Sequence, residues 1–282
     1  MKKGLKLGEF ELFRLSGGRF AIDGGAMFGV VPKVLWSKKY PCCDEENRVP
    51  LIASPILVKT PDTLVLIDTG LGNKLDEKQK RIFRLQGDWD ILKDLSSLDI
   101  KREDIDVVIL THYDFDHAGG VVMMVEGAGP ALTFPDARHI LQETEWQDVL
   151  NPNRRSVNTY WPINYELLKK SGNLELVSGE VEVVEGIKVI HTGGHTRGHQ
   201  VVRMESEGET ALHMGDLLPT HAHFNPLWVT AYDNFPLDAI EIKKELESRG
   251  IEEGSWFTFY HDPFIQACRF DEEGNVVEEW KG

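Results

Sequence analysis

The chain has 282 residues, of which 41% are hydrophobic and 27% are charged, so it can bury the core of an ordinary globular protein. Its formal net charge of -15 argues against a nucleic-acid partner, because phosphate backbones recruit fields of lysine and arginine. No apolar run indicates a signal peptide or a membrane span, and the three cysteines cannot form a paired framework. We therefore expect a cytoplasmic protein with free thiols and no membrane partner.

The first half of the chain alternates short strands with helical pieces. Its predicted strands are short β-rich or apolar runs, at 5–15, 55–59, 63–67 and 106–110. The last of these, DVVIL, is the nearly continuous apolar run of a strand buried on both faces. Residues 74–98 have helical character in pieces, with an interruption at Gly87.

The second half continues this alternation. Its predicted strands lie at 138–141, 187–190, 201–204, 211–214 and 256–260. Helices are predicted at 143–150 and 237–248, and the segment 151–163, rich in Asn, Pro and aromatic residues, is predicted to be a loop or insertion. In the later helix, Leu237, Ile240 and Leu246 predict the buried face and Gly250 the C-terminal end. The chain is therefore α/β or α+β, and without a linker we expect one domain over 1–282.

The strongest chemical signal begins where the DVVIL strand ends. His112, Asp114, Asp116 and His117 fall within six residues, in THYDFDHAGG. In an extended segment, side chains two residues apart point the same way, so several of these groups can converge. Imidazole and carboxylate ligands together suit zinc, iron, manganese or cobalt. A solvated His/Asp-rich loop is the alternative, but such loops seldom carry four potential ligands at this spacing.

Three further candidate ligands each follow a predicted strand. His195 lies in HTGGHTRGH, Asp216 in HMGD and His261 in FYHDP. Each motif alone is weak, because such short combinations occur by chance. Together they fit a metal site assembled from loops at strand ends, where a rigid sheet positions the ligands.

The series Asp68-Thr69-Gly70, His112-x-Asp114-x-Asp116-His117, His195, Asp216 and His261 resembles that of the metallo-β-lactamase superfamily, over about residues 50–270. This resemblance implies an αββα four-layer sandwich. The stretch GGAMFGVVPKVLWSKKYP, residues 24–41, resembles quorum-quenching lactonases that act on N-acyl homoserine lactones. The methyl parathion hydrolases look like a neighbouring group.

The resemblance implies two divalent metal ions. One would be held by His112, His195 and the residue at position 114, and the other by Asp116, His117 and His261. Asp216 would bridge both ions, and Asp68 would support the ligand loops without binding metal. Zinc is the expected metal.

Position 114 departs from the superfamily pattern. Most members have histidine there, giving HxHxDH, whereas this chain has Asp114. A carboxylate is a harder, negatively charged ligand that favours manganese, iron or mixed occupancy over zinc alone. Alternatively, the shorter side chain leaves that metal site weak. The sequence therefore does not decide between zinc, manganese and iron.

Other residues are candidates for a substrate pocket. The apolar candidates are Met27, Phe28, Trp36 and Phe224, and two histidines on the loop after Asp216 join them, His221 and His223. Core packing is the alternative for the apolar residues, and a solvated loop for the histidines. Trp161 is a weaker candidate of the same kind. Of the remaining histidines, His199 is expected to orient a ligand, and His139 and His213 to be structural.

The implied reaction is hydrolysis of a small-molecule lactone or related ester by a hydroxide that bridges two metals. Asp116 is the candidate proton shuttle to the leaving alkoxide. Phosphotriester hydrolysis is the main alternative, followed by a di-iron redox centre, which Asp114 faintly suggests, and by a metal-binding protein without turnover. A homodimer is left open.

Overall fold

The computed structural model describes residues 3–280, and its framework is formed by two seven-stranded sheets. The strands of the first sheet, in spatial order, are β1 (Leu5–Leu7), β2 (Phe10–Arg14), β5 (Ile56–Lys59), β6 (Leu64–Ile67), β7 (Val107–Ile109), β10 (Arg138–Gln142) and β11 (Leu174–Val177). The strands of the second sheet are β12 (Glu180–Val184), β13 (Ile187–His191), β14 (Gln200–Ser206), β15 (Glu209–His213), β16 (Trp256–Thr258), β17 (Ala267–Phe270) and β18 (Val276–Trp280).

The alternation of side chains along β7 explains why the sheets lie face to face. Val107 and Ile109 belong to the apolar cluster between the two sheets, which also contains Val189 and Val202 from the second sheet. Val108 points the other way, into the cluster beneath the outer helices. A strand apolar on both faces therefore separates two hydrophobic layers, as the DVVIL run predicts.

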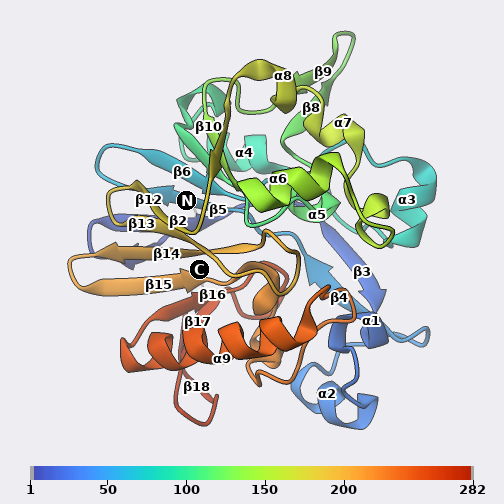
Figure 1. The fold of residues 1–282 in the computed structure, drawn as a ribbon, viewed down its shortest axis with the longest axis vertical. Helices are drawn as coiled ribbons and strands as arrows, with labels where there is room; N and C mark the ends of the chain where they lie inside the picture. The colour runs from blue at the N-terminus through green and yellow to red at the C-terminus, as the bar shows by residue number, and fades with distance from the viewer. Residues whose placement is uncertain (1–2, 281–282) are drawn as a thin grey trace.

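Helices cover both outer faces of the sandwich (Figure 1). Ile91 and Leu95 of α4 (Ile91–Ser96), with Trp146 of α6 (Glu143–Leu150), pack on the first sheet. The long helix α9 (Pro236–Glu252) packs Ala239 and Leu246 on the second sheet. This arrangement confirms the αββα sandwich.

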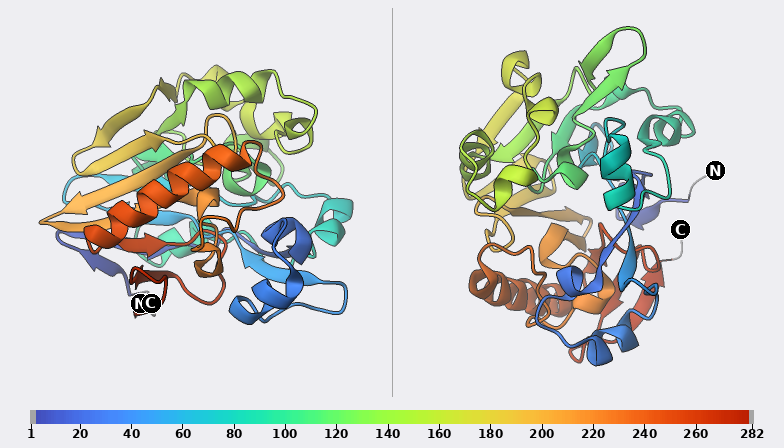
Figure 2. Two further views of the ribbon diagram at one scale, coloured as in Figure 1. Left: turned by 60° about the horizontal axis from the view of Figure 1, so that its bottom comes forward. Right: turned by 90° about the vertical axis from the view of Figure 1, so that its right-hand side faces the viewer.

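Smaller elements decorate the edges of the sandwich. Two small two-stranded sheets stand apart from the main sheets, β3 (Arg19–Asp23) with β4 (Arg48–Ile52) and β8 (Val122–Val125) with β9 (Gly129–Leu132). The short helices are α1 (Gly24–Phe28), α2 (Lys33–Lys39), α3 (Glu77–Ile82), α5 (Phe115–Ala118), α7 (Pro162–Tyr165) and α8 (Leu168–Ser171). Figure 2 shows α1 and α2 beside the sandwich, next to β3 and β4. No helix among residues 3–280 is both long and apolar enough to cross a membrane.

Helix α9 departs from the prediction in two ways. Leu237 is 77% exposed and is not part of the buried face, which instead contains Ala239, Lys243 and Leu246. The helix also continues through Gly250 to Glu252. A Cβ at position 250 would lie 2.5 Å from Cζ of Phe257, which explains the glycine there. Gly250 is thus a close-packing residue rather than a helix stop.

The strand directions bring the predicted ligands to one edge of the sandwich. Strands β6 and β7 are parallel in the first sheet, as are β15 and β16 in the second. Strand β13 runs in the same direction as β15, since both are antiparallel to β14. The loops after these five strands carry Asp68, His112 to His117, His195, Asp216 and His261, so the order of the strands assembles the site.

Candidate metal centre

The structure brings all seven predicted ligands together. They are His112, Asp114, Asp116, His117, His195, Asp216 and His261. The histidine side chains are buried, at no more than 4% exposure, whereas the three carboxylates are 13–17% exposed. The imidazoles therefore form the floor of the site, and the carboxylates face its opening.

The ligands divide into two groups. In the first half-site, Oδ2 of Asp114 lies 3.7 Å from Nε2 of His112 and 3.5 Å from Nε2 of His195. In the second half-site, Nε2 of His261 lies 3.2 Å from Nε2 of His117 and 3.7 Å from Oδ2 of Asp116. Within each of these sets of three, the ligand atoms lie within 4.8 Å of one another, a spacing that can hold a metal ion.

Asp216 connects the two half-sites through its two oxygens. Oδ1 lies 3.2 Å from the Nε2 atoms of both His117 and His261. Oδ2 lies 3.4 Å from Nε2 of His195. Although burial alone would raise it, the surrounding imidazoles hold the pKa of Asp216 well below its usual range. An ionised carboxylate therefore stands between the two groups of ligands.

Two buried atoms indicate that this donor set fits metal ions. Nε2 of His112 and Oδ1 of Asp216 have no hydrogen-bond partner among the described residues. Leaving buried polar atoms unsatisfied is costly, so such atoms point to an absent partner. Burial also lowers the pKa of His112 well below its usual range, which keeps its imidazole neutral and able to donate a lone pair.

Each imidazole is oriented through its other nitrogen. Nδ1 of His195 lies 2.7 Å from Oδ1 of Asp233, and Nδ1 of His261 lies 2.8 Å from the Ile52 carbonyl. These contacts place the proton on Nδ1 and leave Nε2 free to face the site. Asp233 was missed from the sequence, since no motif connects it to His195 across 38 residues.

Asp68 orients ligands of both half-sites. Its Oδ2 lies 2.9 Å from Nδ1 of His117 and accepts the Thr111 hydroxyl at 2.8 Å, while its Oδ1 accepts the Thr111 amide at 2.8 Å. Oγ1 of Thr111 lies 3.1 Å from Nδ1 of His112. Asp68 adopts a left-handed backbone with φ of 58°, which aspartate tolerates better than most residues.

Comparison with known proteins now identifies the family. A family model described as the metallo-beta-lactamase superfamily matches residues 48–254, which include every candidate ligand except His261. The chain belongs to the metallo-beta-lactamase superfamily. A crystal structure of a probable metal-dependent hydrolase from Staphylococcus aureus is 41% identical, has a TM-score of 0.92 and covers 98% of both chains.

More distant relatives include lactonases. The structure of AidC, a dizinc quorum-quenching lactonase in complex with a product, is 21% identical over 99% of this chain and 96% of that one, with a TM-score of 0.81. At that identity the likeness shows the fold alone. An N-acyl homoserine lactonase of a Bacillus species is 30% identical over 54% of each chain. A probable metallo-hydrolase of Mycobacterium tuberculosis is 28% identical over 60% of this chain and 57% of its own length. The chain thus spans little more than half the length of these curated relatives.

The apolar pocket candidates of this superfamily member form a separate cluster. Phe28 stacks on Trp36, with ring centroids 4.7 Å apart, and on His223, with centroids 4.6 Å apart. His223 also contacts the Met27 carbonyl through Nε2, at 3.0 Å. All four side chains are buried, and Met27, Phe28 and Trp36 belong to one apolar cluster that also contains Tyr40 and Tyr260.

The remaining candidates lie around the ligand loops. His221 pairs through Nδ1 with Asp262, the neighbour of His261, and Phe224 packs on Phe270 at a centroid distance of 4.3 Å. Nε2 of His199 accepts the backbone amide of Asp216 at 3.3 Å, so His199 supports a ligand loop as expected. His139 and His213 lie in β10 and β15, as predicted.

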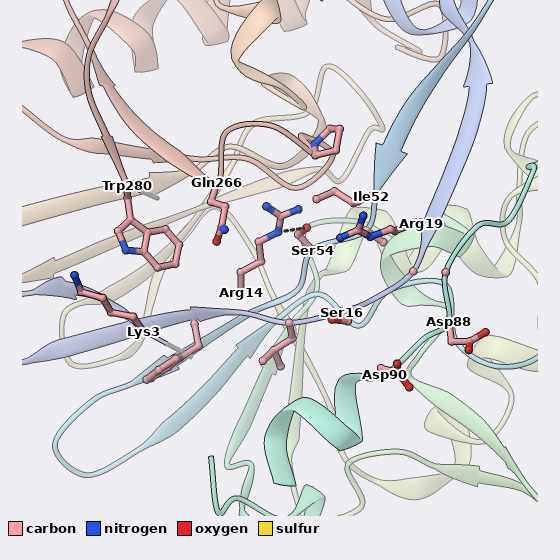
Figure 3. A pocket seen from close by; sticks show the side chains of 16 residues that line it. Lys3, Arg14, Ser16, Arg19, Ile52, Ser54, Asp88, Asp90, Gln266 and Trp280 are labelled. Carbon is pink, nitrogen blue, oxygen red and sulfur yellow. Dashed lines mark hydrogen bonds between the residues drawn. The ribbon is translucent and has the colours of Figure 1, made fainter. Parts of the chain in front are cut away.

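Figure 3 shows a cavity of about 580 Å³ whose lining contains none of the candidate ligands. Arg14, Arg19 and Ile52 line it, and Nε of Arg14 donates to Oγ of Ser54 at 2.8 Å. Ile52 also accepts the His261 hydrogen bond through its carbonyl. None of the seven candidate ligands lines this cavity, so it is distinct from the metal centre.

Proposed function

We propose that this metallo-hydrolase opens lactones or related esters at a site that holds two metal ions. The observation that carries the proposal is the position of Asp216, whose two oxygens face different half-sites at 3.2 and 3.4 Å from imidazole nitrogens. A carboxylate with this environment on both sides is suited to bridge two cations.

The donors support two ions of the same kind. Each half-site offers two imidazoles and one carboxylate of its own, and both share Asp216. Four imidazoles suit zinc, and zinc is the expected metal. Asp114 gives the first half-site the same donor types as the second and increases its preference for the harder ions manganese and iron.

The reaction needs a nucleophile, a polarised carbonyl and a proton for the leaving group. Bound metal ions would supply the first two, by acidifying a water molecule and acting as Lewis acids. Asp116 would accept the proton that the attacking water loses and pass it to the leaving alkoxide when the tetrahedral intermediate collapses. Its carboxylate is suited to this because it is 15% exposed at the opening of the site, 3.7 Å from His261.

Aromatic side chains beside Asp116 favour a substrate with an apolar part. Phe115 stacks between Phe83 and Trp161, with both centroid distances 4.6 Å. These rings are only partly buried, and Phe115 separates the two ligands Asp114 and Asp116 in the chain. Together with the similarity to N-acyl homoserine lactonases, these three stacked rings support an acyl-bearing lactone as the substrate.

The test compares substrate classes on one metal-loaded preparation. N-acyl homoserine lactones of several chain lengths and an aryl phosphotriester are assayed in parallel, with a chelated sample as control. We expect metal-dependent ring opening with a higher kcat/KM than for the phosphotriester. Turnover of phosphotriesters alone would move the activity to that class, and oxygen reduction by an iron-loaded chain would indicate a redox centre. No turnover with two metals bound would leave a binding protein.

A further inference from the structure

Glu145, in the first turn of α6, is a fully buried carboxylate close to the metal centre. Its four recorded hydrogen-bond donors are all neutral. Oε1 accepts the Tyr113 amide at 2.9 Å and the Tyr160 hydroxyl at 3.0 Å. Oε2 accepts the Thr196 hydroxyl at 2.7 Å and the Gly198 amide at 3.2 Å. A buried carboxylate is costly to retain, so this arrangement calls for a role.

Three of the four donors belong to the two loops that carry the first half-site, and the fourth, Tyr160, lies outside them. Tyr113 lies between His112 and Asp114 in the chain, and Thr196 follows His195 directly. Each carboxylate oxygen of Glu145 thus accepts hydrogen bonds from a different ligand loop. None of these four donors belongs to a residue adjacent in sequence to a ligand of the second half-site.

Gly198 allows the second loop to approach this carboxylate. A Cβ at position 198 would lie 2.1 Å from the backbone nitrogen of Glu145, so only glycine fits against the first turn of α6. The His195 loop is therefore seated directly on the helix, which fixes its distance from the His112 loop.

We propose that Glu145 is a positioning residue that sets the separation of His112 and Asp114 from His195, and so determines the metal affinity of the first half-site. This rests on the proposed function only in taking that half-site as a metal site. The lactone substrate plays no part in it.

The geometry explains why a carboxylate is required. Glutamine has one acceptor oxygen, and its NH2 group can only donate. If the NH2 group faces the Thr196 side, it meets the Gly198 N–H; if it faces the Tyr113 side, it meets the Tyr113 N–H. A hydroxyl can turn to accept, but a backbone N–H cannot. Either orientation therefore loses a backbone hydrogen bond to one ligand loop.

Asp148 provides a matched control. It lies on the same helix and pairs with Arg197 of the same loop, at 2.6 Å from Nη2, but this pair is exposed. Exposed ion pairs contribute little to geometry or stability. If any connection between α6 and this loop were sufficient, Asp148→Asn and Glu145→Gln would behave alike.

The experiment titrates metal-free wild type, Glu145→Gln and Asp148→Asn with Mn²⁺ alone. Bound metal per chain is measured by equilibrium dialysis and elemental analysis, and the Mn²⁺ electron paramagnetic resonance spectrum reports whether two ions are coupled. We expect two coupled ions in wild type and Asp148→Asn. In Glu145→Gln, we expect one ion at wild-type affinity with a single-ion spectrum, and a second ion bound about 10- to 100-fold more weakly. Two coupled ions at unchanged affinity in Glu145→Gln would overturn the inference.

Thr196→Val keeps the inference testable if Glu145→Gln does not fold. This substitution removes one hydrogen-bond donor to Glu145 while the other three remain. The metal affinity of the first half-site should therefore fall, as in Glu145→Gln, and that of the second should not change. Unchanged affinity at both half-sites would contradict the role of Glu145. A wild-type chain that binds two ions but does not hydrolyse lactones would overturn the proposed function without contradicting this inference.

Discussion

Replacing Asp68 by Asn tests how the second half-site is oriented. The substitution is nearly isosteric, and asparagine also tolerates the left-handed backbone that Asp68 adopts at φ 58°. The variant should therefore fold, and its effect should be confined to hydrogen bonding. In the wild type, Asp68 accepts from the Thr111 amide at 2.8 Å and lies 2.9 Å from Nδ1 of His117.

Asparagine cannot satisfy both partners. With its oxygen toward the Thr111 N–H, its NH2 group faces Nδ1 of His117, and the imidazole must move its proton to Nε2. In that tautomer, Nε2 carries the proton and has no lone pair with which to coordinate a metal ion. In the opposite orientation, the NH2 group faces the Thr111 N–H, which cannot accept. Either way a charge-assisted hydrogen bond is lost, at a cost of about 1.5–3 kcal/mol.

This cost corresponds to about 10- to 150-fold in metal affinity, at 1.4 kcal/mol per tenfold. It should be largest at the second half-site, because Asp68 contacts His117 directly and reaches His112 only through Thr111. Affinity is measured by chelator competition with metal analysis of the recovered protein. Asp233→Asn is the matched control, because Oδ1 of Asp233 lies 2.7 Å from Nδ1 of His195. This substitution should instead lower the metal affinity of the first half-site. Wild-type affinity at the second half-site in Asp68→Asn would refute the reasoning.

Three further predictions concern single residues. Asp116→Asn should lower turnover by about 100-fold or more while metal content falls much less, and a variant with both metals and near-normal kcat would contradict the proton-shuttle role. Asp114→His should raise the zinc-over-manganese selectivity of the first half-site in competition binding, and unchanged selectivity would contradict the role given to its carboxylate. Burial lowers the pKa of His139 to about 4, so the folded chain keeps this imidazole neutral while the unfolded chain protonates it near pH 6.5. This group therefore lowers the free energy of unfolding by up to about 3 kcal/mol as pH falls from about 6.5 to 4. Between pH 7 and pH 4.5, His139→Gln should lose less free energy of unfolding than wild type, as measured by urea unfolding.

Much of the sandwich could be predicted from local pattern. Strands such as β6 and β7 lie in apolar runs that can be recognised without tertiary contacts. The antiparallel pair of β3 and β4 was missed because its short strands lack a strong alternation and pair across a separation that includes α1 and α2. Helix α9 was placed correctly, but its buried face includes Lys243, whose ammonium donates to the Trp228 carbonyl at 3.0 Å. A hydrophobicity pattern cannot predict a buried lysine of this kind.

The residues of the metal centre also include some that the sequence predicts and some that only the tertiary structure reveals. The seven candidate ligands could be proposed from the sequence because four of them share one short motif and the other three follow predicted strands in the pattern of the superfamily. The residues that orient them, Asp233 and Glu145, lie on a loop and a helix without any motif, and only tertiary contacts bring them to His195 and Thr196. Asp68 was recognised as a supporting residue through the resemblance to the superfamily, since its contact with His117 spans 49 residues.

The most direct test of the two-metal lactonase is to follow activity and metal binding in one titration. Metal-free chain receives zinc in fractions of an equivalent, while bound metal and proton release from an N-acyl homoserine lactone are measured on the same samples. The account predicts that turnover stays low over the first equivalent and rises as the second ion binds. Full turnover with one ion bound, or none with two, would contradict it.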